Sequence, residues 1–303
     1  MSFVPRTVED MALDWPRELD HISASSVKMA ARCPEQWRQR YVLHKKQPPA
    51  AALLAGWADH AAVERSMVQK IDTFVDLPTS EVQQFYVHAL EERIEEAGGP
   101  GEIEIKDVDG LTAKKAHLDD LKVTGQEVVK QYHTTVSPYV QPLQVEKEFE
   151  LTVTGLPVKV VGRQDLIAIG APDVPRKWGA PMNGDHPRII DRKRRTRAKP
   201  TPDPEWVIQA EVYQLADPLP HEWHLSVTTK TPKICVPSEG FYPDLVLPVR
   251  DPVIAETQLM HIVAEIGFFM RRYGPDAPWP TRGKLHTWAC NYCGYRPDCW
   301  GWR

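Results

Sequence analysis

The sequence predicts an α/β fold in which helices precede and follow a group of β-strands. Apolar residues recur at helical spacing through much of the first 142 residues, whereas polar and apolar residues alternate with a period of two from Leu143 onward. A further change occurs at Asp203, where an acidic cap followed by Pro204 starts a new helix. This order of elements indicates one α/β unit with a helical insertion.

Local signals place the individual elements. The expected helices cover residues 22–41 (as two short segments), 50–68, 80–97, 115–136, about 203–217 and 252–273. The expected strands cover residues 144–153, 158–169, 188–195, 221–230 and 241–249. We therefore expect three regions: an N-terminal helical region at 1–142, a strand-rich core at 143–250, and a C-terminal helix with a cysteine-rich tail at 251–303.

The composition excludes several protein classes. With 42% hydrophobic and 26% charged residues, the 303-residue chain is expected to form one large domain or two small ones, and fibrous and largely disordered classes are excluded. No stretch approaches the roughly 18 uninterrupted apolar residues of a membrane helix, and the first residues lack the pattern of a secretory signal. We expect a cytoplasmic protein that does not contact a membrane.

Charge is distributed unevenly along the chain. The total of 37 Lys plus Arg against 41 Asp plus Glu gives a net charge of -4, which argues against a protein that coats nucleic acid by bulk charge. The window 188–199, however, contains seven basic residues and one acidic residue. We expect four arginines of this window to contact a DNA backbone: Arg192, Arg194, Arg195 and Arg197.

The cysteines predict a metal site. Cys290, Cys293 and Cys299 form a C-x2-C-x5-C pattern, and Cys33 lies far upstream. Four thiolates complete one site for zinc or for an iron-sulfur cluster. Three clustered ligands with one remote ligand favour the cluster, because a zinc ribbon usually pairs two short-spaced cysteine motifs. Cys235 is isolated, and we expect no role for it.

A second group of residues suggests hydrolytic chemistry. Asp191 and Lys193 are two residues apart on an expected strand, so both side chains lie on one face. Pairing with the preceding strand would bring Asp165 beside Asp191. Two carboxylates form an oxygen site for Mg2+ or Mn2+. A neighbouring ammonium suits phosphodiester hydrolysis, because it orients water or stabilises charge on the phosphate.

The order of the motifs resembles a known family. The segments SASSVKMAARCPEQWRQRY, GWADH, GRQDLI, IIDRKRR, QAEVY and the cysteine tail follow one another from Ser23 to Cys299. This series resembles the PD-(D/E)xK nuclease superfamily and, within it, RecB-like exonucleases with an iron-sulfur cluster, which include CRISPR-associated exonucleases and phage relatives. The resemblance implies a restriction-endonuclease-like core, with a central mixed β-sheet flanked by helices.

The resemblance also implies roles for individual residues. The residues that match metal ligands are His60, Asp165 and Asp191. The residues that match catalytic positions are the lysine Lys193 and the helical pair Gln209 and Tyr213. The residues that match the ligands of a 4Fe-4S cluster are Cys33, Cys290, Cys293 and Cys299. The sequence departs from the family at Arg194 and Arg195, where relatives commonly have a small polar residue, and in the long connection between the two aspartates.

The expected function is that of a Mg2+- or Mn2+-dependent DNA exonuclease that prefers single strands or DNA ends. One alternative is a catalytically weak DNA-end-binding or scaffold subunit of a recombination or adaptation complex, which the altered residues after Lys193 suggest. Another is a zinc-ribbon protein that binds nucleic acid. The expected partners are DNA and either a second copy of the chain or a helicase or adaptation protein.

Overall fold

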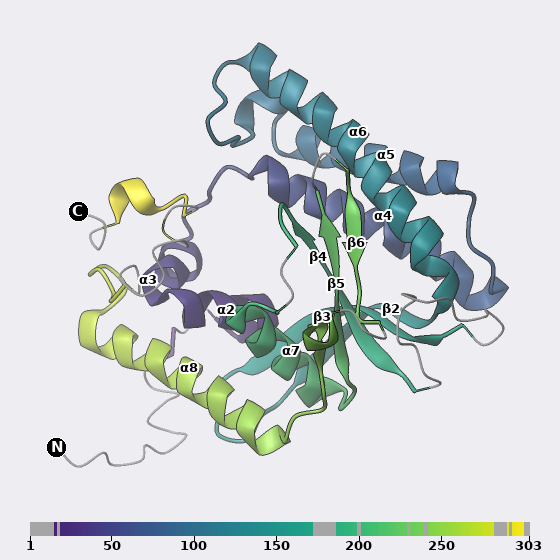
Figure 1. Ribbon diagram of the computed structural model, residues 1–303. Helices are drawn as coiled ribbons and strands as arrows, with labels where there is room; N and C mark the ends of the chain where they lie inside the picture. The colour runs from purple at the N-terminus through teal and green to yellow at the C-terminus, as the bar shows by residue number, and fades with distance from the viewer. Residues whose placement is uncertain are drawn as a thin grey trace.

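A computed structural model describes residues 15–16, 19–171, 186–198, 201–228, 231–238, 242–281, 290 and 293–299 (Figure 1). The α-helices are α2 Ala24–Arg32, α3 Pro34–Trp37, α4 Ala51–Thr73, α5 Thr79–Glu96, α6 Leu111–Thr135, α7 Pro204–Ala216 and α8 Pro252–Tyr273. The strands are β1 His21–Ser23, β2 Val140–Leu151, β3 Lys159–Gly170, β4 Arg188–Arg195, β5 His221–Val227, β6 Lys233–Cys235 and β7 Val246–Leu247. The short helical turns are η1 Arg38–Val42, η2 Pro100–Glu102, η3 Ser137–Tyr139, η4 Pro243–Leu245 and η5 Arg296–Asp298.

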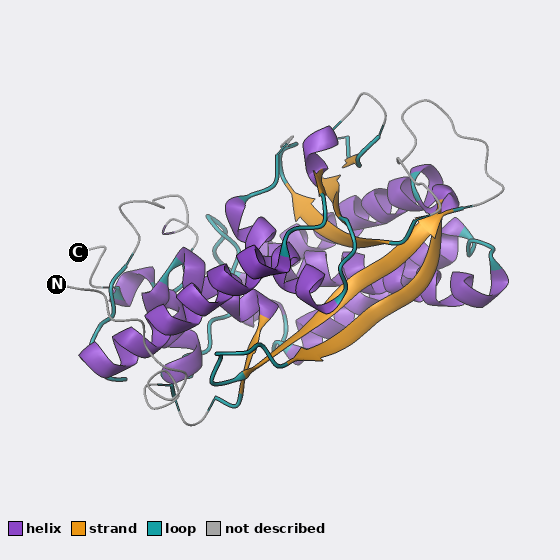
Figure 2. Cartoon of the chain, turned by 90° about the horizontal axis from the view of Figure 1, so that it is seen from below, coloured by secondary structure: helices purple, strands orange, loops and turns teal. Residues whose placement is uncertain are grey.

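The central sheet is mixed, as predicted. Its main path is β1-β3-β4-β5-β6, with β2 on β3 and β7 on β5. β3 pairs in parallel with β1 and antiparallel with β2 and β4, whereas β4 pairs in parallel with β5. Figure 2 shows β2 and β3 as a long two-stranded ribbon. The fold is thus an α/β fold with helices on both faces of the sheet.

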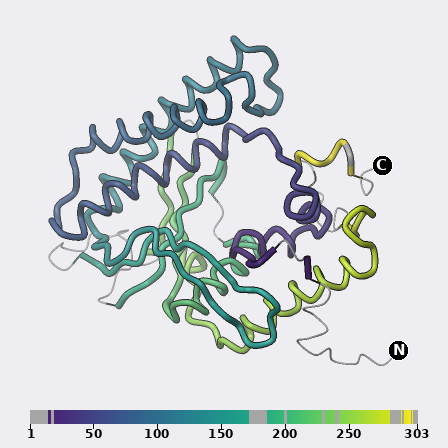
Figure 3. The backbone as a smooth tube through the Cα atoms, turned by 180° about the vertical axis from the view of Figure 1, so that it is seen from behind, coloured from purple at the N-terminus to yellow at the C-terminus, as the bar shows by residue number. Residues whose placement is uncertain are grey.

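Two helical layers cover the sheet (Figures 1 and 3). Alternation along β4 sends neighbouring side chains into different cores. Ile189 packs with residues of α2, α7 and α8, and Ile190 packs with residues of α4 and α6. A further apolar cluster joins α4, α5 and α6 to one another. The period of two predicted from the sequence therefore decides which layer each β4 residue faces.

β3 is where the sheet divides. β2 occupies one edge of β3 over almost its whole length. On the other edge, β1 pairs with residues 159–161 and β4 pairs with residues 166–168. Residues 162–165 therefore have no strand partner on that edge within the described part of the chain. This interruption lies beside the residues that the sequence predicts for chemistry.

The N-terminal helices differ slightly from expectation. Residues expected to begin a helix at 22 instead form β1, and the helix starts after Ser23, whose hydroxyl accepts a hydrogen bond from the Ser26 backbone at 3.1 Å. The second helical segment ends in the π-helical turn η1. Three residues are enough for β1 because Ile22 is buried in the core between the sheet and α2.

α8 is the one helix of the described residues whose length and hydropathy would allow it to cross a membrane. One side of α8 is buried, with Leu259, Val263 and Ile266 in the core that also contains α2 and α7. A core helix of a globular domain passes the same test of length and hydropathy. The finding is therefore weak evidence for a membrane span.

Candidate metal centre

The first part of the site forms where β3 and β4 meet. Their antiparallel register pairs Leu166 with Ile190 and Ile167 with Ile189. Asp165 and Asp191 are the next residues along the two strands, so the predicted pairing is confirmed and brings the two acids close together. Beyond this point, the side chain of Asp165 takes the place of a backbone acceptor on β3. Its Oδ2 accepts a hydrogen bond from the backbone N–H of Arg192 at 3.1 Å.

His60 reaches the same point from α4. Its Nε2 lies 2.9 Å from the Arg192 carbonyl oxygen, and its Nδ1 lies 3.2 Å from Asp165 Oδ2. Since a carbonyl oxygen only accepts, Nε2 carries the hydrogen in the neutral ring and Nδ1 keeps a lone pair for a metal. Burial would lower the pKa of His60. The charge of Asp165, and the hydrogen bond that Nδ1 donates to it when the ring is protonated, raise the pKa above its ordinary value.

Glu146 completes a three-residue group that the sequence did not identify. One ligand atom each from His60, Glu146 and Asp165 lies within 4.8 Å of the others. Glu146 is in β2 with a φ of 49°, a left-handed backbone conformation that is unusual for a glutamate and occurs preferentially at functional sites. Burial, together with the negative charges of Asp165 and Glu64, raises the pKa of Glu146 to about 7. The alternation of glutamates along β2 is typical of a solvated face, and the sequence carries no signal for this turn of the backbone.

Asp191 is held by different partners. Lys193 Nζ lies 2.7 Å from its carboxylate, and His221 Nε2 lies 3.7 Å from Oδ2. Both Asp191 and His221 are buried. Burial would raise the pKa of Asp191, but Lys193 and His221 hold it well below its ordinary value. The structure thus brings together His60 and Asp165, two of the three residues predicted as metal ligands. The third, Asp191, lies on the adjacent strand outside this group and forms an ion pair with Lys193.

The helical pair predicted on α7 lies next to Lys193. Gln209 Oε1 is 3.4 Å from Lys193 Nζ, and Gln209 Nε2 donates to the Tyr213 hydroxyl at 2.7 Å. Their separation by four residues puts both side chains on one helix face. Burial, with the charges of Asp191 and Asp165, raises the pKa of Tyr213 well above its ordinary value, so the phenol stays protonated at neutral pH.

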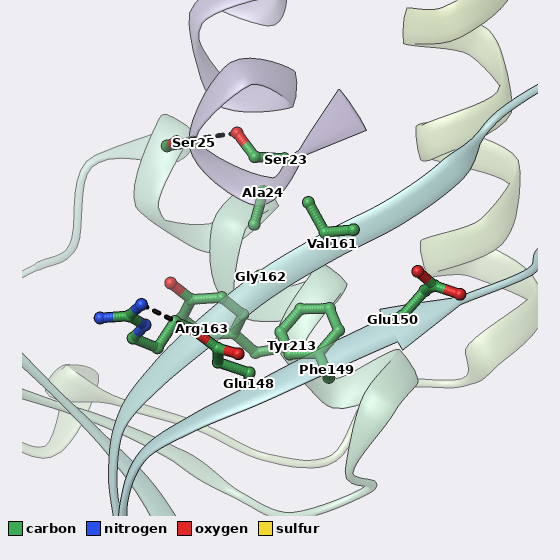
Figure 4. Close-up of a pocket in the computed structure, with 10 residues that line it drawn as sticks. All are labelled: Ser23, Ala24, Ser25, Glu148, Phe149, Glu150, Val161, Gly162, Arg163 and Tyr213. Atoms are coloured by element: carbon green, nitrogen blue, oxygen red, sulfur yellow. Dashed lines mark hydrogen bonds and ion pairs between the residues drawn. The ribbon is translucent and has the colours of Figure 1, made fainter. Parts of the chain in front are cut away.

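A cavity of about 660 Å3 opens beside this group (Figure 4). Residues of α2, β2, β3 and α7 line it, including Ser25, Phe149 and Tyr213. The Phe149 ring lies across β3 and meets Tyr213 edge-on at 5.8 Å between ring centroids. This crossing requires Gly162, because a Cβ there would lie 2.3 Å from the Phe149 ring. The interrupted edge of β3 and a glycine together make room for the cavity.

The four arginines predicted to contact DNA have different surroundings. Arg192 is buried, donates to Asp59 through both terminal nitrogens at 2.8 and 3.1 Å, and lies over the Tyr132 ring. Arg194 packs on Tyr86, and Arg195 pairs with Asp203 over Trp206. Arg197 is exposed. The geometry therefore corrects the expectation for Arg192, whose guanidinium is enclosed by the protein and not presented to a phosphate backbone.

The predicted cluster cysteines lie close to one another. Cys33 joins α2 to α3, and the other three lie in the C-terminal tail, which Figures 1 and 3 place beside α3. Burial raises the pKa of the Cys293 thiol, and the charges of Cys33, Cys299 and Cys290 raise it further. All four are free thiols.

Hydrogen bonds fix the tail next to the N-terminal helices. Tyr295 Oη donates to the Lys45 carbonyl at 2.7 Å, and the Trp279 backbone donates to Glu35 of α3 at 2.7 Å. Trp37 and Trp279 stack with ring centroids 6.0 Å apart. Four neighbouring cysteine thiols, two of which have pKa values raised by burial and by the charges of other cysteines, fit a site that would hold a metal group through four thiolates.

One comparison with known proteins identifies the family of this chain. The model of the family described as "PD-(D/E)XK nuclease superfamily" matches residues 21–300. A solved structure described as "Crystal structure of SSO0001" is similar, with 13% identity and a TM-score of 0.37 over 98% of this chain and 95% of that chain. No curated protein matches the chain. Since the family model spans the sheet, the candidate metal ligands and the cysteine tail, the chain belongs to the PD-(D/E)XK nuclease superfamily.

Proposed function

We propose that this protein is a Mg2+- or Mn2+-dependent DNA exonuclease that acts on single strands or DNA ends. The observation that carries the proposal is the group of His60, Glu146 and Asp165 next to the Asp191–Lys193 pair. Membership of a nuclease superfamily and the donor types of this group both support metal-dependent hydrolysis of DNA.

The donor set fits a divalent cation. Two carboxylates and an imidazole nitrogen face one another. Among the described residues, the arginine that pairs with these acids is Arg163, whose terminal nitrogen is 3.5 Å from Glu146. The pKa of Glu146 is raised first by burial and then by the negative charges of Asp165 and Glu64, which a cation would compensate. A cation held by His60, Glu146 and Asp165, with Asp191 as the neighbouring acid, would supply Lewis-acid stabilisation of the charge that develops on the phosphate.

The protein's own groups account for the remaining steps. Lys193 holds a positive charge beside Asp191, where it can orient the attacking water and stabilise charge on the phosphate. Gln209 fixes the ammonium from the other side, and Tyr213 fixes Gln209. Lys193 is thus positioned by hydrogen bonds from two elements, β4 and α7.

The cavity supports a single-stranded substrate or a frayed end. Its volume of about 660 Å3 suits unstacked nucleotides, and Phe149 and Tyr213 contribute aromatic surface on which a base can stack. The resemblance to RecB-like exonucleases supports the same choice. We therefore include end-dependence in the proposal.

The four cysteines are proposed to hold a 4Fe-4S cluster with a structural role. Cys33 at the α2–α3 junction and three tail cysteines would then join the two ends of the chain. A brown protein with visible absorption that Cys33→Ser abolishes supports the cluster. A colourless protein that contains one zinc ion would support the zinc alternative instead.

The test of the function is cleavage of end-labelled linear single-stranded DNA in Mn2+. We expect Lys193→Met to lower the rate about 10²- to 10³-fold, as for loss of one positioned electrostatic group. Lys115→Met removes an exposed lysine of α6 and should cleave like the unchanged protein. Circular single-stranded DNA should resist cleavage.

Two outcomes would count against this proposal. Absence of cleavage with any divalent cation would favour the scaffold alternative, and full activity of Lys193→Met would remove Lys193 from the mechanism. Cleavage of circular DNA would leave a nuclease but rule out an obligatory exonuclease.

A further inference from the structure

Lys28 of α2 lies in the same group as Lys193, and no pattern in the sequence singles it out. Its Nζ donates to Gln209 Oε1 at 3.1 Å. The same oxygen lies 3.4 Å from Lys193 Nζ. Two ammonium groups from α2 and β4 therefore meet at one amide oxygen, which is uncharged and offers two lone pairs.

The two lysines differ in their compensation. Lys193 has the Asp191 carboxylate at 2.7 Å. Within the described residues, Lys28 has no carboxylate oxygen within 4.0 Å. Asp191 and then Glu205 act on its charge from further away, and these two acids pair with Lys193 and Arg32. Burial, and then the charge of Lys193, lower the pKa of Lys28 to about 8, so it remains mostly protonated at neutral pH.

This arrangement is unfavourable for stability in the free protein. A half-buried ammonium next to a second one, with a neutral hydrogen-bond acceptor and with Asp191 and Glu205 acting only from further away, loses hydration without gaining a direct ion pair. A structural lysine at this place would be expected to have a carboxylate partner, as Lys70 has in Asp76 at 2.9 Å. The unmatched positive charge is suited to an anion that arrives with the substrate.

The cavity lies near the lysine pair. Gln209 accepts hydrogen bonds from both lysines through Oε1 and donates one to the Tyr213 hydroxyl through Nε2. Tyr213 in turn lines the cavity (Figure 4). Ser23 and Ser25 at the start of α2 line the cavity as well. Two hydrogen-bonded side chains, Gln209 and Tyr213, therefore connect the lysine pair to the space in which we place the DNA strand.

We propose that Lys28 binds a backbone phosphate of the DNA strand beside Lys193, so that the two lysines and Gln209 form a phosphate-binding group in the nuclease site. This inference rests on the proposed function for its ligand. It adds a substrate contact from α2, the helix that leads to Cys33, and thereby joins the cysteine-bound end of the chain to the hydrolytic site.

The experiment measures binding of a fluorescently labelled single-stranded oligonucleotide in EDTA, so that cleavage does not interfere. We expect Lys28→Met to weaken binding about 5- to 10-fold and to reduce the slope of log K against log salt by about 0.7, the value for one phosphate contact on a single strand. Lys28→Arg should keep most of the affinity. Lys115→Met removes the same charge from α6 and should change neither quantity.

Unfolding separates this role from a structural one. Lys28→Met should unfold in urea at the same or a higher concentration than the unchanged protein, because it removes an uncompensated cation. A large loss of stability together with weaker binding would indicate a structural role and overturn the inference. Unchanged affinity and salt slope in Lys28→Met, or no DNA binding by the unchanged protein, would overturn it as well.

The outcomes also separate this inference from the proposed function. DNA binding that depends on Lys28 without cleavage in any divalent cation would reject the nuclease and keep the phosphate contact. Cleavage by the unchanged protein, with normal DNA binding by Lys28→Met, would keep the nuclease and reject the contact.

Discussion

Two sets of charged residues on and around β4 differ in how completely the protein compensates them. On the side of α4 to α6, Arg192 is enclosed with Asp59, so that its charge is neutralised inside the fold. In the candidate site, Lys28 lacks a carboxylate partner within 4.0 Å among the described residues, and Glu146 lies beside Asp165 with the exposed Arg163 as its ion-pair partner at 3.5 Å. The compensated set holds the layers together, and the incompletely compensated set is available to a metal and a phosphate. Local charge alone does not distinguish the two sets, whereas the partners do.

The largest expected effect tests the compensated set. Arg192→Met should lower the free energy of unfolding by about 3–5 kcal/mol, because it leaves Asp59 buried without its partner. Urea unfolding followed by circular dichroism measures this loss. The double variant Asp59→Leu with Arg192→Met should recover much of it, since an apolar pair replaces an ion pair. A loss below about 1 kcal/mol in the single variant would mean that the pair does not hold the layers together.

A smaller effect is expected for the acids of the candidate metal group, of which Glu146 is one. Glu146→Gln should weaken Mn2+ binding at least about 10-fold, because it removes a charged ligand and the repulsion that favours a cation. Calorimetric titration of the metal-free protein measures the affinity. Glu148→Gln is the matched control: Glu148 lies two residues further along β2, is exposed and pairs with Arg163. Equal affinities of the two variants would exclude Glu146 as a ligand.

The smallest expected effect concerns pH and Lys28. Lys193, Asp191, Glu205 and Arg32 surround this ammonium, and its pKa in the folded protein is about 8, below the ordinary value of 10.5. The unfolded chain therefore holds more protons between these two pH values, so the contribution of Lys28 to stability rises as pH increases from about 8 to 10.5. Below pH 8 the contribution is constant and unfavourable.

Urea unfolding at pH 7.5 and pH 9.5 tests this sign. Relative to Lys28→Met, the unchanged protein should gain about 1 kcal/mol at the higher pH, after allowance for screening by solvent. A relative loss at pH 9.5 would show that Lys28 is stabilised by an ion pair and belongs to the compensated set.

The sequence predicted those parts of the fold and site that depend on local pattern. Alternation placed Asp191 and Lys193 on one face of β4, and Asp203 with Pro204 marked the start of α7. The pairing of β3 with β4 followed from two consecutive strand patterns. These features need no knowledge of what packs against each face.

The features that the sequence did not predict depend on tertiary contacts. Alternation places Arg192 on the opposite face of β4 from Lys193, but it does not predict that Arg192 contacts Asp59 of α4 on that face. Glu146 enters the site through a left-handed backbone conformation, and Lys28 meets Gln209 across 181 positions of the chain. Gly56, in the GWADH segment of α4, has no atom within 4 Å of where a Cβ would be, so a close approach of another element does not explain the glycine.

The most direct test of the metal centre is the anomalous difference map of a crystal soaked in Mn2+. We expect a peak within bonding distance of His60, Glu146 and Asp165, next to the strand that carries Asp191 and Lys193. A well-occupied Mn2+ site elsewhere in the protein, with no peak among these side chains, would contradict it.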